Sequence, residues 1–100
     1  MSKLVKRQRY RVDGDDEFLL RFAREDDGTF SIWCDDHPYN RHGGGAQDHH
    51  LYSNGQVCVT VGREPTSLDR AIAIGHVFMT SFAHWCKYGT RGRTGGKVNV

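Results

Sequence analysis

Two histidines, a tight-turn sequence and a cysteine follow one another within residues 49–60, and their side chains are the ones in this chain best suited to chemistry. His49 and His50 precede a Ser-Asn-Gly turn at 53–55, and Cys58 follows between two valines. A cysteine thiolate is a nucleophile, and a nearby imidazole can activate it or orient the site. The segment therefore predicts Cys58 as a candidate nucleophile. The alternative is a partly buried cysteine that acts as a small hydrophobe.

The valines around the cysteine predict how it is presented. Val57, Val59 and Val61 alternate with polar residues, which is typical of a strand with one buried face. Cys58 has the opposite parity. If the valines face a core, the thiol points away from it.

Earlier in the chain, alternating apolar residues predict a meander of strands. Tyr10 and Val12 indicate a short first strand, and residues 17–24 have one wholly apolar parity. Residues 25–28 end in Asp-Gly, which favours a hairpin turn, and 29–34 form the returning strand. Residues 35–47 have no periodicity and include three consecutive glycines, so we expect a long loop over one face of the sheet. His37 and His42 reach the site only if this loop folds over it.

A single helix is predicted over residues 68–88. Apolar residues recur there at three- or four-residue steps, Thr66 or Ser67 supplies an N-cap, and Gly89 supplies a C-cap. The fold class is therefore α+β, an antiparallel meander with a long C-terminal helix packed on it. The expected organisation is a flexible basic N-terminus (1–8), a single domain (9–90) and a flexible tail (91–100).

Composition limits the classes of function. The chain has 100 residues, with 14 basic and 12 acidic residues and a net charge of +2, which argues against nucleic-acid binding by the whole chain. Three cysteines, an odd number, and no signal peptide argue against a secreted disulfide scaffold. No apolar run is long enough to span a membrane. We expect a cytoplasmic protein with reduced thiols, with no membrane and no cofactor.

Two other interpretations of the polar residues were open. Cys34-x-x-His37, with His42, His49, His50 and Cys58, offers zinc-ligand types, but it contains only one tightly spaced pair, so no metal is predicted. The Arg/Gly stretch 91–96 could lie along phosphates, and a solvated tail is the preferred interpretation. Its Gly-Gly also resembles the end of a ubiquitin-like modifier from which residues 97–100 would be removed, but the position of the long helix late in the chain argues against that.

Residues 51–58, Leu-Tyr-Ser-Asn-Gly-Gln-Val-Cys, closely resemble the active-site segment of ubiquitin-conjugating enzymes. In that family a His-Pro-Asn triplet precedes a turn, often Asn-Gly, and the cysteine that carries ubiquitin as a thioester follows. Here Asp48-His49-His50 stands in place of the triplet, and His50 occupies the position of its functional asparagine. The helix that follows also resembles the helix of compact bacterial relatives encoded in ubiquitin-like anti-phage operons.

The resemblance implies a reduced form of that family's fold and a conjugating activity. Cys58 would carry a modifier and pass it to an amine of a target protein. His50 would donate to the oxyanion or act as base, and Asn54 and Gly55 would form the turn, with Asp48 and Tyr52 in support. The implied partners are a ubiquitin-like modifier protein, an activating enzyme and a target protein. The family's N-terminal helix is not expected here. The alternative is a non-catalytic module that binds a modifier or zinc.

Overall fold

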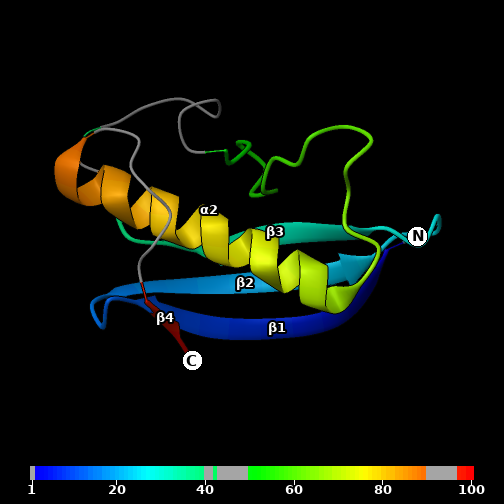
Figure 1. Cartoon of the computed structure of the whole chain (residues 1–100), viewed down its shortest axis with the longest axis horizontal. Helices are drawn as coiled ribbons and strands as arrows, with labels where there is room; N and C mark the ends of the chain where they lie inside the picture. The colour runs from blue at the N-terminus through cyan, green and yellow to red at the C-terminus, as the bar shows by residue number, and fades with distance from the viewer. Residues whose placement is uncertain (1, 40–41, 43–49, 90–96) are drawn as a thin grey trace.

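Four antiparallel strands and one helix make up the described part of the chain (Figure 1). The computed structural model describes residues 2–39, 42, 50–89 and 97–100. The strands are β1 (Lys3–Val12), β2 (Asp16–Arg24), β3 (Phe30–Asp36) and β4 (Val98–Asn99), and the helix is α2 (Leu68–Tyr88). The sheet order is β3-β2-β1-β4, and α2 lies across one face of it. The predicted α+β class, an antiparallel sheet with a long helix packed on it, is confirmed.

The turn between β2 and β3 follows from its Asp-Gly sequence. The Glu25 N–H donates to the Thr29 carbonyl (2.8 Å), and the Gly28 N–H donates to the Glu25 carbonyl (3.0 Å). Gly28 has a φ of 86°, which a residue without Cβ adopts at little cost. Asp27 Oδ1 accepts from the Thr29 N–H (3.0 Å). The predicted hairpin is therefore present, as a three-residue loop closed by a glycine bulge.

The core lies between α2 and the inner face of the sheet. Phe18, on β2, meets the rings of Phe78 and Phe82, on α2, edge to face, with centroids 6.2 Å and 5.8 Å apart. The helix approaches β2 closely at Gly75, where a Cβ would lie 2.9 Å from Leu20 Cδ1. The largest fully buried side chains are Phe18, Phe22, Leu20, Ile32, Met79 and Val12.

Both ends of α2 are capped as the sequence predicts. Ser67 Oγ accepts from the Arg70 N–H (3.2 Å), and Asp69 in the first turn favours the helix dipole. Gly89 is left-handed (φ 70°), and its N–H donates to the Trp85 carbonyl (2.8 Å). Among the described residues, no helix combines the length and apolar character needed to cross a membrane.

The strand predicted through Val61 is wrong. Val57 is buried, but Val59 is only partly buried and Val61 is 91% exposed. Residues 58–60 belong to no strand, because the chain leaves the sheet after Val57 and bends where the Arg63 N–H donates to the Thr60 carbonyl (2.9 Å). Alternation of valines alone did not ensure a partner strand.

The two ends of the chain also differ from the prediction. β1 begins at Lys3, within residues assigned to a basic N-terminus, because Lys3 pairs with Arg24 in the β1–β2 ladder. Residues 98–99, assigned to a tail, form β4, with Val98 opposite Val12. Both segments join the sheet through backbone hydrogen bonds. Such pairing does not require an apolar side-chain pattern, so the sequence gives little sign of it.

Candidate active site

Residues 50–58 form a tight hairpin built around the predicted Asn54-Gly55 turn. The Tyr52 N–H donates to the Gln56 carbonyl (2.8 Å), and the Gly55 N–H donates to the Tyr52 carbonyl (2.9 Å). Gly55 takes a φ of 94°. Asn54 does not use positive φ; its Oδ1 accepts from the Gln56 N–H instead (3.0 Å). The hydrogen bonds match those of the β2–β3 turn, so the same three-residue loop occurs twice in this chain.

The hairpin is fixed to the free edge of β3. The Cys34 N–H donates to the Gly55 carbonyl, and the Val57 N–H donates to the Ile32 carbonyl, each at 2.8 Å. Val57 is only 2% exposed and belongs to the core cluster. Val57, with the partly buried Leu51 across the hairpin, anchors it to the core, and the next residue, Cys58, is held beside Val57.

Two hydrogen bonds define the surroundings of Cys58, which is half-buried. Its backbone N–H donates to the His50 carbonyl (2.7 Å), which closes the base of the hairpin. A side-chain hydrogen bond with Cys58 raises the pKa of the Tyr52 hydroxyl above its ordinary value. Tyr52 therefore remains protonated at neutral pH and available as a donor next to the sulfur.

The other two cysteines are poor nucleophiles. Burial raises the pKa of Cys34 to about 12, and its Sγ donates to the Asp36 carbonyl (3.2 Å). Burial, with the nearby Asp16 carboxylate, raises the pKa of Cys86 to about 11. Since the thiolate is the reactive form, neither reacts readily at neutral pH. Cys58 is the thiol that remains.

The predicted histidines are placed differently from one another. His50 is exposed, has a φ of 58°, and contacts Cys58 through its carbonyl. His37 stacks on Phe82 with ring centroids 4.8 Å apart. A Cβ on Gly89 would lie 2.9 Å from the His42 ring. His37 and His42 thus lie along the C-terminal half of α2, whereas Asp48 and His49 fall outside the described residues.

The zinc alternative has no support in the described residues. No three His, Cys, Asp or Glu side chains gather there as a group able to hold a metal ion. Cys34 and His37, the one tightly spaced pair, have separate partners, the Asp36 carbonyl and the Phe82 ring. His49 lies outside this comparison.

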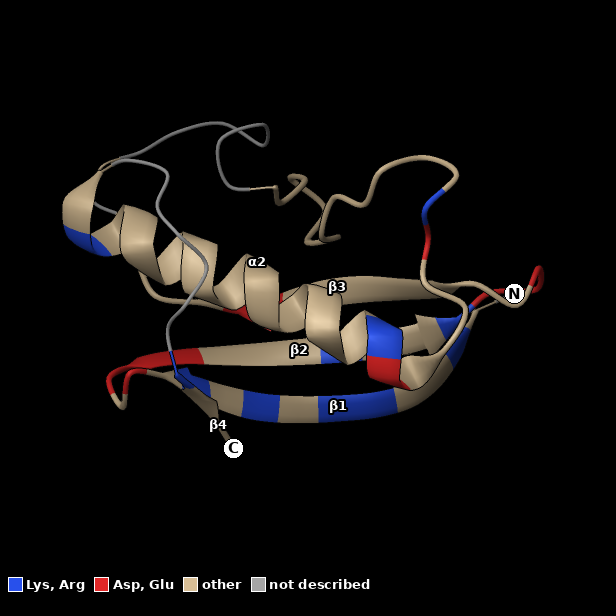
Figure 2. Cartoon of the chain, viewed as in Figure 1, with Lys and Arg blue, Asp and Glu red and all other residues tan. Residues whose placement is uncertain are grey.

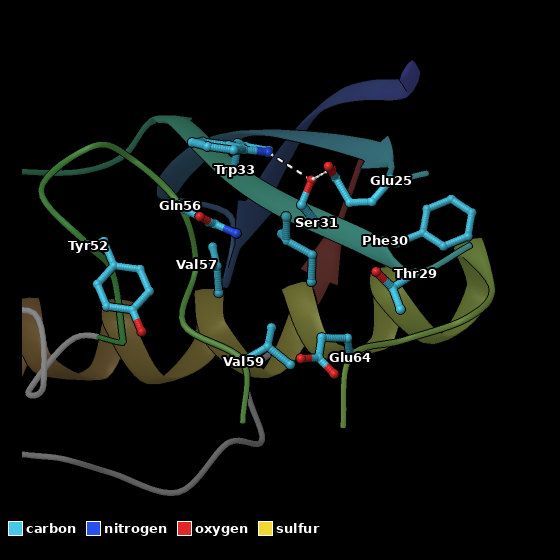
Figure 3. A pocket seen from close by; sticks show the side chains of 11 residues that line it. Glu25, Thr29, Phe30, Ser31, Trp33, Tyr52, Gln56, Val57, Val59 and Glu64 are labelled. Atoms are coloured by element: carbon cyan, nitrogen blue, oxygen red, sulfur yellow. Dashed lines mark hydrogen bonds between the residues drawn. The ribbon is translucent and has the colours of Figure 1, made fainter. Parts of the chain in front are cut away.

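A cavity of about 370 Å³ lies between β3 and the segment that carries the hairpin (Figure 3). Tyr52 and Gln56 line one side of the cavity, and a row of hydrogen-bonded polar side chains, called the polar chain below, lines another. The Trp33 Nε1–H donates to Ser31 Oγ (3.0 Å), and Ser31 donates to Glu25 Oε2 (2.6 Å). Residues beside the candidate nucleophile thus border an open, partly polar space.

Sequence reasoning missed the polar chain and gave Tyr52 only a supporting place. Ser31 and Trp33 alternate with the core residues of β3. This alternation could have predicted that the two side chains lie together on the outer face of the strand. Nothing local in the sequence indicated that Arg21, on β2, would lie over the Trp33 ring (5.0 Å).

Compared with protein-family models, curated proteins and solved structures, the chain has no match.

Proposed function

We propose that this protein is a conjugating enzyme for a ubiquitin-like modifier, acting with an activating enzyme and a target protein, and that it belongs to a bacterial anti-phage system of the kind the sequence resembles. The observation that supports this best is the position of Cys58. Cys58 follows a hairpin with a three-residue Asn-Gly loop, which is fixed to the edge of the meander. The Tyr52 hydroxyl is hydrogen-bonded to Cys58, and a long helix follows in the chain.

Loading is a thiol exchange. The Cys58 thiolate attacks the carbonyl of the modifier thioester held by the activating enzyme. The new C–S bond forms as the old one breaks, and the activating enzyme's cysteine leaves as a thiolate. The half-buried Cys58 is open to such an approach, whereas Cys34 is enclosed in the core.

Transfer is an aminolysis. A lysine amine of the target attacks the Cys58 thioester, the tetrahedral oxyanion collapses, an amide forms and the Cys58 thiolate leaves. In this scheme Tyr52 donates a hydrogen bond to the oxyanion or to the departing sulfur. His50 lies opposite Cys58 in the hairpin and is exposed, so in this scheme its ring takes the proton released by the amine.

A direct test uses the full chain with the activating enzyme and ubiquitin-like protein encoded beside its gene, plus ATP. We expect an adduct at Cys58 that disappears with a thiol reductant on a gel. Cys86→Ser, a matched change at another thiol, should load normally. A thiol-sensitive adduct on Cys58→Ser would refute the assignment.

The two proposed side-chain roles separate in single-turnover assays. Tyr52→Phe keeps the ring and removes the donor, and we expect transfer to an amine to slow about tenfold or more while loading changes less. His50→Ala should also slow transfer more than loading. Equal losses in both steps would instead indicate a structural role for the residue.

A further inference from the structure

β1 is an edge strand for most of its length. It pairs with β2 from Lys3 to Val12, but on its other side it pairs with β4 only at Arg11 and Val12. In the part of the chain that the structure describes, residues 3–10 have no strand on that side. An edge of this kind presents unpaired backbone groups that can accept another strand.

The register shows which backbone groups face this edge. The Asp13 N–H donates to the Lys97 carbonyl (2.8 Å), so residues of odd number direct their N–H and C=O groups toward the β4 side. Arg7 and Arg9 are the next two such residues. A register shift between Leu4 and Lys6 interrupts the regular pattern beyond them. The accessible ladder is therefore short and centred on residues 7–9.

The edge is strongly basic. Within Lys3–Val12 there is no acidic residue, and Figure 2 shows the blue bands along β1. The basic residues are Lys3, Lys6, Arg7, Arg9 and Arg11. Arg7 has an ion partner on β3 (Asp35), and Arg9 has one on β3 (Asp36) and one on β2 (Glu17). Their side chains are still 56% and 48% exposed, and each guanidinium has more donors than these contacts use. A second copy of β1 would bring like charges together, which disfavours self-pairing.

The short strand β4 shows what a partner strand needs. Val98 lies opposite Val12, faces the helix side and packs partly against the core, whereas Asn99 lies opposite Arg11 on the outer face. Continued along β1, this register puts Val100 of the chain itself opposite Tyr10, and the same alternation gives the next apolar position opposite Gln8. It gives outer positions opposite Arg9 and Arg7, where a carboxylate has an opposite charge directly across the ladder.

We infer that the open edge of β1 binds an extended acidic segment of another protein, which adds as an antiparallel strand in line with β4. The segment alternates apolar and acidic residues, with the acidic ones opposite Arg9 and Arg7. Backbone hydrogen bonds supply affinity, and the arginine row supplies selectivity. The inference does not depend on Cys58 or on the proposed function.

The test uses a fluorescent, end-blocked hexapeptide of alternating Val and Glu, titrated with the full chain. Binding should be saturable, weaken with salt, and shift the amide NMR signals of Arg7 and Arg9. The same peptide N-methylated at the two Glu amides that face Arg7 and Arg9 keeps its charge but loses the two backbone donors directed at β1, and it should bind at least about tenfold more weakly. Equal binding of the two peptides would overturn the inference.

Charge is tested on the protein itself. Arg7→Glu with Arg9→Glu should weaken binding about tenfold or more, because two attractive cross-strand pairs become repulsive. The matched control, Arg63→Glu with Arg70→Glu, makes the same charge change at two residues outside β1 and should stay within about twofold. Equal weakening by both pairs would show a non-specific charge effect and contradict the inference. If the first pair unfolds the protein, the N-methyl comparison on the native chain decides.

Discussion

The close approach of α2 to β2 at Gly75 leads to a quantitative prediction about stability. In Gly75→Ala the new Cβ would lie 2.9 Å from Leu20 Cδ1 and 3.5 Å from Phe22 Cε1, and both of these side chains are fully buried. Alanine improves helix propensity by roughly 1 kcal/mol. Overpacking of a filled core costs roughly 1–3 kcal/mol. We therefore expect the free energy of unfolding to fall by about 1 kcal/mol.

Urea unfolding followed by circular dichroism and tryptophan fluorescence measures this change. The matched control is Ala73→Gly, at an exposed position two residues earlier on α2. It reports helix propensity without a packing term and should cost about 1 kcal/mol. If Gly75→Ala stabilises the protein by as much as Ala73→Gly destabilises it, the steric argument is refuted.

A double-mutant cycle identifies the neighbour responsible. Leu20→Ala alone should cost about 3 kcal/mol by leaving a cavity under the helix. Combined with Gly75→Ala, the total should fall to about 2 kcal/mol, because the added methyl enters the space that Leu20 vacates and the gain in helix propensity of about 1 kcal/mol remains. Simple additivity would mean that the two positions do not compete for the same volume.

Three further changes have defined outcomes. Burial raises the pKa of Cys34 to about 12 from an ordinary 9.0, so the unfolded chain loses its thiol proton first and stability should fall as pH rises from 9 toward 12. Cys34→Ala should flatten that part of the stability profile measured by urea unfolding. Gly55→Ala, at a φ of 94°, should lower the free energy of unfolding by about 1 kcal/mol in the same urea measurement, because alanine is strained at positive φ. Ser67→Ala should lower the free energy of unfolding by about 1 kcal/mol, while Ser67→Asp, which keeps a capping oxygen, should preserve it.

Elements with a strong local pattern could be predicted from the sequence. The one-sided alternation of β2, the Asp-Gly turn and the capped stripe of α2 each determine their own conformation. β4 could not be predicted in the same way, because two residues carry no periodicity and their pairing with β1 depends on a partner far away in the chain. The start of β1 at Lys3 has the same cause: its backbone pairs with β2, while its side chains stay in solvent.

The candidate site was predictable in its turn and less so in its contacts. Asn-Gly predicts a tight loop, but only the structure shows that Asn54 acts through its side chain and that Gly55 alone uses positive φ. The loop length decides which residues face each other. With this loop length the Cys58 N–H donates to the His50 carbonyl, and the Tyr52 hydroxyl is hydrogen-bonded to Cys58.

The end of pairing with β3 at Val57 gives Cys58 a particular combination of order and access. Before it, backbone hydrogen bonds to β3 and the buried Val57 side chain fix the chain. After Val57 the chain leaves the sheet, and residues 58–60 form no strand. Had the strand continued to Val61 as predicted, Cys58 would lie within an extended pairing edge and its surroundings would be more crowded. A thiol that must accept and release a bulky acyl group needs a fixed position together with open space. In the proposed mechanism, the early end of pairing with β3 supplies this combination at Cys58.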